Sequence, residues 1–386
     1  MEYFKTEGLA VGYRGRSLIH DINIGMEKGK ILTLIGPNGA GKSTILKTIT
    51  RHLARIGGTV AIGGKDIRGW SAKEMAGQVA VVLTERICPE LMTCGEVVAM
   101  GRYPYTNAMG KMTAADKEAV LRALQRVHAT ELEKQDFSTL SDGQRQRIML
   151  ARAICQEPQV IVLDEPTAYL DIRFKIELLD ILREMAHEEG TAVVMSLHEI
   201  DLASKISDYM VCVKGDTIAA FGTPEEIMKE GVIESLYGLE KGNYNQLYGS
   251  VEFGRPEGEP RVFVVAGGGY GTEVYRLLQK WQIPFATGIL HENDIDCPVA
   301  SALSGHVVTA PAFEEMTEEQ LEKALEWMQK AGTLIHAGTP IGSTNRVNGQ
   351  LLELAEEMRF PIYRSAGEWL EAQRQNGHCG AQGAEV

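Results

Sequence analysis

Short apolar runs separated by glycine turns dominate the first half of the chain. Such runs are typical of buried strands, and we expect strands at Leu9–Val11, Ile22–Ile24, Ile31–Ile35, Val160–Leu163 and Val193–Leu197. A glycine-rich turn follows Ile35, and the pattern then predicts a helix from Lys42 to about Thr50. Residues 86–137 have a mostly helical pattern, and Thr223-Pro224 predicts a helix start with Thr223 as its N-cap.

The pattern changes after residue 250. Between 254 and 260 the chain reads Gly-Arg-Pro-Glu-Gly-Glu-Pro, without apolar periodicity, which indicates a linker. A strand at Val262–Ala266 follows, and apolar residues then recur at helical spacing from Val274, Leu321 and Leu351, with a strand at Thr333–His336. Alternating strands and helices predict a parallel sheet covered by helices. We therefore expect an α/β domain at 1–250, a linker at 251–260 and a smaller Rossmann-like α/β domain at 261–386.

Composition narrows the functional classes. The 386 residues suffice for two domains with separate cores, and no apolar run approaches the roughly 18 residues of a membrane-spanning helix. The N-terminus lacks the features of a signal peptide, and the six cysteines show no CxxC spacing, so we expect a cytoplasmic protein. A net charge of −13 argues against non-specific nucleic-acid binding, and it would suit the Lys- and Arg-rich cytoplasmic loops of a membrane partner.

The turn after Ile35 has the pattern of a phosphate-binding loop. Glycines in such a loop let successive backbone N–H groups face the phosphates, and the following helix adds its dipole. We expect ATP to bind the residues Gly36, Pro37, Asn38, Gly39, Ala40, Gly41, Lys42, Ser43 and Thr44. Lys42 should reach the β- and γ-phosphates, and the Ser43 hydroxyl should bind Mg²⁺.

Two adjacent acids follow the strand at Val160–Leu163. At its carboxyl end Asp164 can hold the Mg²⁺ shell, and Glu165 is then placed to orient or deprotonate the attacking water. Such a pair alone is often a solvated turn. Downstream of a phosphate-binding loop it indicates the second half of a nucleotide hydrolysis site.

The run from Leu140 to Arg147, Leu-Ser-Asp-Gly-Gln-Arg-Gln-Arg, resembles the signature of ABC ATPases, usually written LSGGQ. With the phosphate-binding loop, Asp164-Glu165, Tyr169-Leu170-Asp171 and Leu197-His198, it makes residues 1 to about 250 resemble that family in the expected order. The resemblance implies an ABC-type P-loop ATPase domain with a helical subdomain. It also implies a homodimer, in which the signature of one subunit closes over ATP held by the other.

The same resemblance assigns roles to single residues. Ser141, Gly143 and Gln144 would contact ATP from the signature, and the aromatic ring of Tyr13 would stack on adenine. His198 would contact the γ-phosphate, and Asp171 would couple the two ATP sites.

Two positions depart from the family pattern. Asp142 stands where the signature has glycine, and we expect its carboxylate to point away from the nucleotide, because repulsion would weaken closure. The strand at Val79–Leu83 ends in Thr84 where the family has a glutamine that touches Mg²⁺ and water. Thr84 is shorter, so its contact with the metal is in doubt, and Glu85 is a candidate replacement.

The stretches 91–104 and 165–171 resemble the importers of ferric siderophores, haem and cobalamin. This resemblance implies two membrane permease subunits, a groove at residues 86–105 for the permease, an extracytoplasmic solute-binding protein and a place on the cytoplasmic face of the membrane. The solute itself is not encoded in this chain. Soluble ABC proteins of translation carry two cassettes, and those of DNA repair carry a long coiled coil; this sequence has one phosphate-binding loop and no such coil.

The second domain leaves several interpretations open. Its glycines at 267–271 could form a nucleotide turn or only a tight connection, and the domain could bind a metabolite, be an enzyme or enlarge the dimer interface. The histidines 291, 306 and 336 fit no metal-binding spacing. Cys88-Pro89 and Cys297-Pro298 resemble haem-responsive dipeptides, although chance is the simpler explanation.

Overall fold

The computed structural model describes residues 2–83, 91–106, 111–229 and 231–375. The chain forms two compact units, Met1–Gly238 and Leu239–Val386. Residues 239–250 therefore group with the second unit and not with the first domain, where the sequence pattern places them. Each unit has its own hydrophobic core, and each is described separately below.

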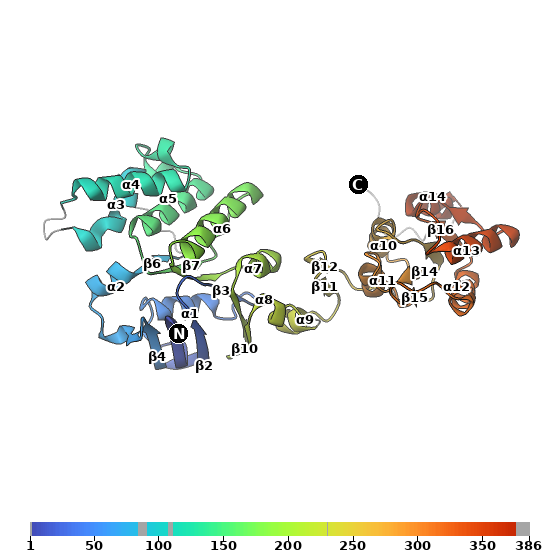
Figure 1. The fold of residues 1–386 in the computed structure, drawn as a ribbon, viewed down its shortest axis with the longest axis horizontal. Helices are drawn as coiled ribbons and strands as arrows, with labels where there is room; N and C mark the ends of the chain where they lie inside the picture. Colours follow the sequence, from blue (N-terminus) through green and yellow to red (C-terminus); the bar gives the residue numbers. More distant parts are fainter. Residues whose placement is uncertain (1, 84–90, 107–110, 230, 376–386) are drawn as a thin grey trace. The chain divides into compact units, whose positions relative to one another are not determined.

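Two sheets form the first unit (Figure 1). The six-stranded sheet has the order β10-β9-β3-β8-β7-β6, with all neighbours parallel except β10 and β9. Its strands are β3 Ile31–Ile35, β6 Val79–Val82, β7 Val160–Asp164, β8 Ala192–Ser196, β9 Tyr209–Lys214 and β10 Thr217–Gly222. An antiparallel sheet has the order β2-β1-β4-β5, from β1 Phe4–Tyr13, β2 Arg16–Met26, β4 Gly57–Ile62 and β5 Lys65–Asp66.

Helices connect these strands. They are α1 Lys42–Ile49, α2 Ala72–Gln78, α3 Cys94–Ala99, α4 Ala114–Arg126, α5 Asp142–Cys155, α6 Ile172–His187, α7 Ile200–Ile206, α8 Pro224–Ile227 and α9 Val232–Tyr237. The 3₁₀ segments within the described part of this unit are η1 Ile67–Gly69, η2 Met100–Tyr105, η3 Thr130–Leu132 and η4 Phe137–Thr139. Helices α3, α4 and α5 pack against one another as a helical subdomain beside the six-stranded sheet (Figure 1).

The second unit begins with a hairpin, β11 Asn243–Asn245 and β12 Ser250–Glu252. Its five-stranded sheet is parallel throughout, in the order β15-β14-β13-β16-β17. The strands are β13 Val262–Val265, β14 Phe285–His291, β15 His306–Ala310, β16 Leu334–His336 and β17 Ile362–Tyr363. The helices are α10 Gly271–Lys280, α11 Cys297–Leu303, α12 Glu318–Ala331, α13 Arg346–Glu357 and α14 Ala366–Gln375.

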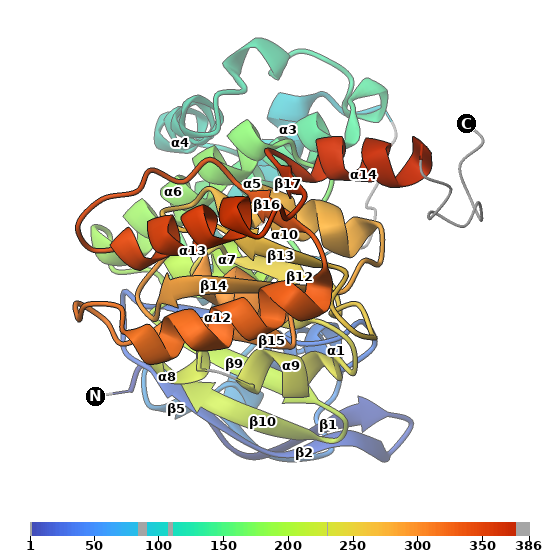
Figure 2. The ribbon, with the colours of Figure 1, turned by 90° about the vertical axis from the view of Figure 1, so that its right-hand side faces the viewer.

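Both faces of this sheet are covered, as the side chains of β13 show. Val262 and Val264 pack with α10, α11 and α14 on one face, and Phe263 and Val265 pack with α12 and α13 on the other. Figure 2 shows α12 and α13 crossing in front of the strands. Because both faces of the sheet are covered, the central strand β13 is apolar and buried at every position instead of alternating.

The predicted fold class is confirmed: the chain is α/β, and the second unit is a parallel sheet with helices on both faces. Thr223 caps a helix that begins at Pro224, as the sequence predicted. Among the described residues, no helix has the length and apolar character needed to span a membrane.

Candidate nucleotide site

The phosphate-binding loop joins the buried strand β3 to helix α1. Gly36, Gly39 and Gly41 have φ values of 147°, 79° and 98°, which lie in the region that glycine adopts readily. A Cβ at Gly36 would lie 2.3 Å from the carbonyl oxygen of Val213 on β9, so the loop also needs glycine for this close approach. These constraints fix the loop at the carboxyl end of the central strand.

Lys42 points into this loop. Its side chain is buried, and its Nζ donates to the carbonyl oxygens of Gly36 at 2.7 Å and Pro37 at 3.0 Å. Burial lowers the pKa of Lys42, and the charges of Glu165 and Asp164 act in the opposite direction. The ammonium group therefore lies where a phosphate could replace the carbonyl oxygens as its partner.

The acidic pair lies next to His198 because β7 and β8 are neighbours in register. Ser196 Oγ donates to Asp164 Oδ1 at 2.7 Å and accepts from the Glu165 backbone N–H at 2.9 Å. Glu165 has a φ of 50°, and its Oε1 lies 2.6 Å from His198 Nε2. Two strand ends thus hold the carboxylates and the imidazole together. Sequence reasoning missed Ser196, although its place at the end of a strand before Leu197-His198 was a usable signal.

Ser141 begins the signature helix α5 as its N-cap. Its Oγ accepts from the Gln144 N–H, and the Gln144 side chain accepts from the Ser141 N–H in return, a reciprocal capping box. A Cβ on Gly143 would lie 3.5 Å from a Leu170 side-chain carbon, so the signature lies against the segment that precedes Asp171. Asp171 itself caps α6 by accepting from the Phe174 N–H at 3.0 Å.

The two departures from the family pattern have different outcomes. Asp142 pairs with Arg145 one helical turn along, at 3.4 Å, and Arg145 also donates to the carbonyl oxygens of Ser138 and Leu140. Thr84 and Glu85 lie outside the described residues, as does Cys88-Pro89.

Tyr13 lies at the end of β1, beside the phosphate-binding loop. Its hydroxyl is 3.2 Å from Thr44 Oγ1 on α1, and about half of its surface is exposed. The ring is therefore close to the loop and accessible to a base.

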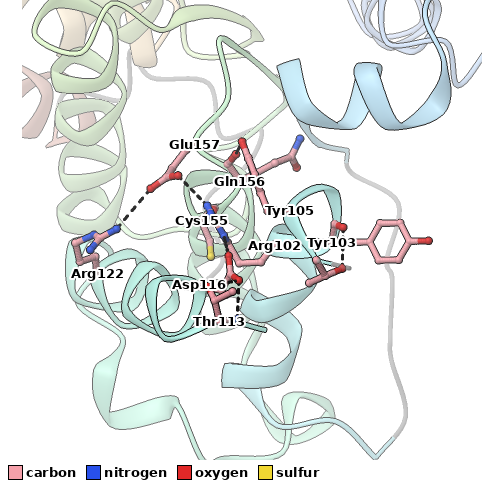
Figure 3. A network of polar contacts seen from close by, with 10 residues as sticks. Arg102, Tyr103, Tyr105, Thr113, Asp116, Arg122, Cys155, Gln156 and Glu157 are labelled. Carbon is pink, nitrogen blue, oxygen red and sulfur yellow. Dashed lines mark hydrogen bonds and ion pairs between the residues drawn. The ribbon is translucent and has the colours of Figure 1, made fainter. Parts of the chain in front are cut away.

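A network of polar contacts around the buried Arg102 and Asp116 connects η2, where the sequence suggested a permease groove, to the helical subdomain (Figure 3). The Arg102 guanidinium is buried and pairs with Asp116 Oδ1 at 2.9 Å and Glu157 Oε2 at 2.8 Å. It also donates to the Cys155 carbonyl at the end of α5 and stacks on the Tyr105 ring. Hydrogen bonds from Thr113, and then Arg102, lower the pKa of Asp116 to about 2. The sequence placed Arg102 within the stretch 91–104 that resembles the importers, but it did not reveal these contacts.

The same segment turns apolar side chains outward. Tyr103 is 77% exposed and projects away from the network in Figure 3. Met100 on η2 and Leu91 ahead of α3 are also exposed. One face of η2 thus contacts the helical subdomain, and the other exposes an apolar surface.

In the second unit the candidate residues do not form one site. His291 and His336 each contact a backbone oxygen nearby, of Glu314 and Thr339, and His306 stacks on Trp327. Within the described ranges, no group of three or more His, Cys, Asp or Glu side chains could hold a metal ion. Cys297 is buried at the start of α11, and burial raises the pKa of its thiol.

Comparison with known proteins assigns two parts of the chain to families. Residues 19–168 match the ABC transporter family, and residues 285–382 match the MJ0874 family. An uncharacterized ABC transporter ATP-binding protein of Methanocaldococcus jannaschii, MJ0873, is 44% identical over 287 residues, which is 74% of this chain and 99% of that protein.

Two further relatives have named solutes. The iron(3+)-hydroxamate import ATP-binding protein FhuC of Bacillus subtilis is 36% identical over 240 residues, 62% of this chain and 89% of that protein. The cobalamin import ATP-binding protein BtuD of Halobacterium salinarum is 28% identical over 371 residues, 94% of this chain and 93% of that protein. The alignment with BtuD therefore extends through both units.

Among solved structures, cbiO1 of Clostridium perfringens, part of the ABC transporter complex cbiONQ, matches with a TM-score of 0.52 and 26% identity. The match covers 61% of this chain and 93% of that one.

Proposed function

This chain belongs to the ABC transporter family of ATP-binding proteins, and on that premise we propose that it is the motor subunit of an importer for iron-siderophore, haem or cobalamin-type solutes. As a member of this family it is an ATPase. The importer class is supported by the similarity to the hydroxamate and cobalamin import proteins. A soluble ABC protein of translation or DNA repair is not favoured by these relatives.

One observation carries the hydrolytic part of the proposal: Glu165 lies 2.6 Å from His198, directly after an Asp164 that Ser196 holds in place. In this proposal Glu165 accepts a proton from the attacking water, and His198 contacts the γ-phosphate. Lys42 and the N–H groups of Gly36–Thr44 bind the phosphates, and Tyr13 stacks on adenine. Positioning and charge neutralisation provide most of the catalysis in phosphoryl transfer.

The oxygen donors at this site suit Mg²⁺, which prefers carboxylate and hydroxyl ligands. Ser43 and Asp164 would hold the ion, and Asp164 is buried with one oxygen already fixed by Ser196. The ion would neutralise phosphate charge.

We further propose that two copies of the chain dimerise around ATP, with Ser141, Gly143 and Gln144 of one copy contacting the nucleotide of the other and Asp171 coupling the sites. Exposed Tyr169, Ile172 and Ile176 around Asp171 support an interface there. The exposed face of η2 in each copy would receive one of two permease subunits at the cytoplasmic side of the membrane, and an extracytoplasmic binding protein would deliver the solute.

Uptake measurements test the importer class. Cells that lack the chain should lose uptake of one of three radiolabelled solutes: a ferric siderophore, haem or cyanocobalamin. The wild-type gene should restore it and the Glu165→Gln gene should not. Undiminished uptake of all three in the deletion strain would refute the importer class while leaving the ATPase assignment intact.

A further inference from the structure

The strand order of the second unit predicts where a ligand would bind. From β13 the sheet grows in both directions, to β14 and β15 on one side and to β16 and β17 on the other. The chain connections after β13 and β16 therefore leave in opposite directions at the carboxyl edge. Open α/β sheets bind ligands in the crevice that this divergence creates.

The glycine-rich turn at this edge is already filled by carboxylates of the same chain. Asp294 accepts from the Gly268 N–H at 2.8 Å. The buried Asp296 accepts from the N–H groups of Gly269, Gly271 and Thr272 and from the Thr272 hydroxyl, at 2.8–3.0 Å. These are the donors that would otherwise cradle a pyrophosphate in a dinucleotide-binding turn. The turn is therefore closed to phosphate by an internal anion.

A cavity of about 610 Å³ lies beside the filled turn. The ends of three strands contribute to it: Gly268–Tyr270 after β13, Ala337 after β16 and Arg364–Gly367 after β17. Its apolar wall includes Val274 and Leu277 of α10. This volume is within the range of small-molecule sites, and the half-exposed Tyr270 ring offers a flat surface.

Opposite charges lie at the solvent-exposed edge of this cavity. Neither the exposed Arg364 guanidinium nor the exposed Glu273 carboxylate makes an ion pair or hydrogen bond with any part of the chain that the structure describes. The nearby acids are already engaged, because Glu368 accepts from the Arg364 backbone N–H and Asp294 and Asp296 are held by the glycine turn. Arg364 also precedes the first turn of α14, whose dipole favours an anion there.

We propose that this cavity binds a small zwitterion with a flat or apolar body, such as an amino acid or a close relative. Arg364 would pair with the carboxylate and Glu273 with the ammonium group. The body would lie against Tyr270, Val274 and Leu277. A dinucleotide is not accommodated, because Asp294 and Asp296 occupy its phosphate cradle.

Calorimetric titration of the full chain tests the site with defined probes. L-tryptophan carries both charges, tryptamine lacks the carboxylate and indole-3-propionate lacks the ammonium group. We expect L-tryptophan to bind at least about tenfold more tightly than either analogue, the size of one charge-assisted hydrogen bond, and NAD⁺ not to bind this unit.

Two variants separate the charge contacts from structural damage. Arg364→Gln should remove the preference for L-tryptophan over tryptamine but keep its preference over indole-3-propionate, and Glu273→Gln should do the reverse. Arg359→Gln and Glu357→Gln change exposed residues outside the cavity, so they should alter neither the preference for L-tryptophan over tryptamine nor its preference over indole-3-propionate.

Three outcomes would overturn the proposal. The first is that L-tryptophan does not bind at millimolar concentration, and the second is that both cavity variants lose the same affinity for all three probes. The third is NAD⁺ binding that persists in Lys42→Ala chains and weakens in Arg364→Gln chains.

Discussion

At the residue scale, the backbone around Glu165 is unusually constrained. Its φ of 50° is uncommon for a residue with a side chain, its N–H bonds to Ser196 Oγ, and its carboxylate contacts His198. Such strain persists where the surrounding structure fixes the residue, and it is frequent at functional sites. The constraint aims one carboxylate at one place, as a base that must meet a single water molecule requires.

Replacing Glu165 with Gln should remove hydrolysis and keep ATP binding. The amide has nearly the same shape and can still contact His198, but it cannot accept a proton, so kcat should fall by about 10²–10⁴-fold. Phosphate release and binding of a fluorescent ATP analogue measure the two effects. Glu188→Gln, on an exposed residue at the end of α6, should change neither. Turnover near the wild-type rate would exclude Glu165 as the base.

Single residues were also the level at which the sequence was most informative. The phosphate-binding loop, the Asp164-Glu165 pair and the signature each consist of consecutive residues. A role for each can therefore be predicted from the local sequence alone. Ser196 was missed because its role depends on the pairing of β7 with β8. Asp294 and Asp296 were missed for the same reason, since their bonds to the glycine turn connect positions 24 to 27 apart.

At the scale of elements, α5 connects two surfaces. The signature residues cap its first turn, and its last residues are bonded to η2 through Arg102, which holds the Cys155 carbonyl, and Tyr105, which donates to the Gln156 carbonyl. Gly101 lies so close that a Cβ there would be 2.3 Å from the Arg152 carbonyl oxygen. A displacement of η2 should therefore move α5 with it as one body.

Arg102→Met tests this connection. The change leaves the buried Asp116 carboxylate without its guanidinium partner, and removal of one member of a buried pair is strongly destabilising. We expect the melting temperature of the first unit to fall by about 5 °C or more. Arg122→Met, which removes an exposed arginine from the edge of the same network, should lower it far less. Equal effects in the two variants would show that the buried pair does not hold η2 to α5.

Elements themselves were predictable where their periodicity was strong. The helices from Val274, Leu321 and Leu351 and the strands at 31–35 and 160–163 lie where the pattern placed them. The order of the strands could not be predicted, because hydrophobic periodicity shows which face of an element is buried and not which neighbouring element covers that face. The network of Arg102 joins residues up to 55 positions apart, which no local pattern encodes.

At the scale of the whole molecule, the proposed ATP site needs two chains. Mixing Lys42→Ala chains with Ser141→Arg chains tests this, because a mixed dimer keeps one intact loop facing one intact signature. Each variant alone should be inactive, and an equal mixture should recover roughly a quarter of the wild-type rate if sites act independently. Phosphate release measures it. An inactive mixture, with dimers verified by sedimentation, would contradict action between chains.

The division of the chain makes a last prediction about where it can be cut. The first unit ends at Gly238 and has its own core. A chain of residues 1–238 should therefore fold and bind ATP with a Kd within about twofold of that of the full chain, as expected for independent sites.

A chain that ends at Phe253 should be less stable and should aggregate more readily, because it keeps the β11–β12 hairpin without the rest of the second unit. The buried Glu252 carboxylate would lose its partner Arg276, and exposed Val251 and Phe253 would add an apolar surface. Melting curves, ATP titrations and light scattering of the two chains measure this difference. If the shorter chain aggregated while the longer one stayed monodisperse and active, the hairpin would belong to the ATPase and not to the second unit.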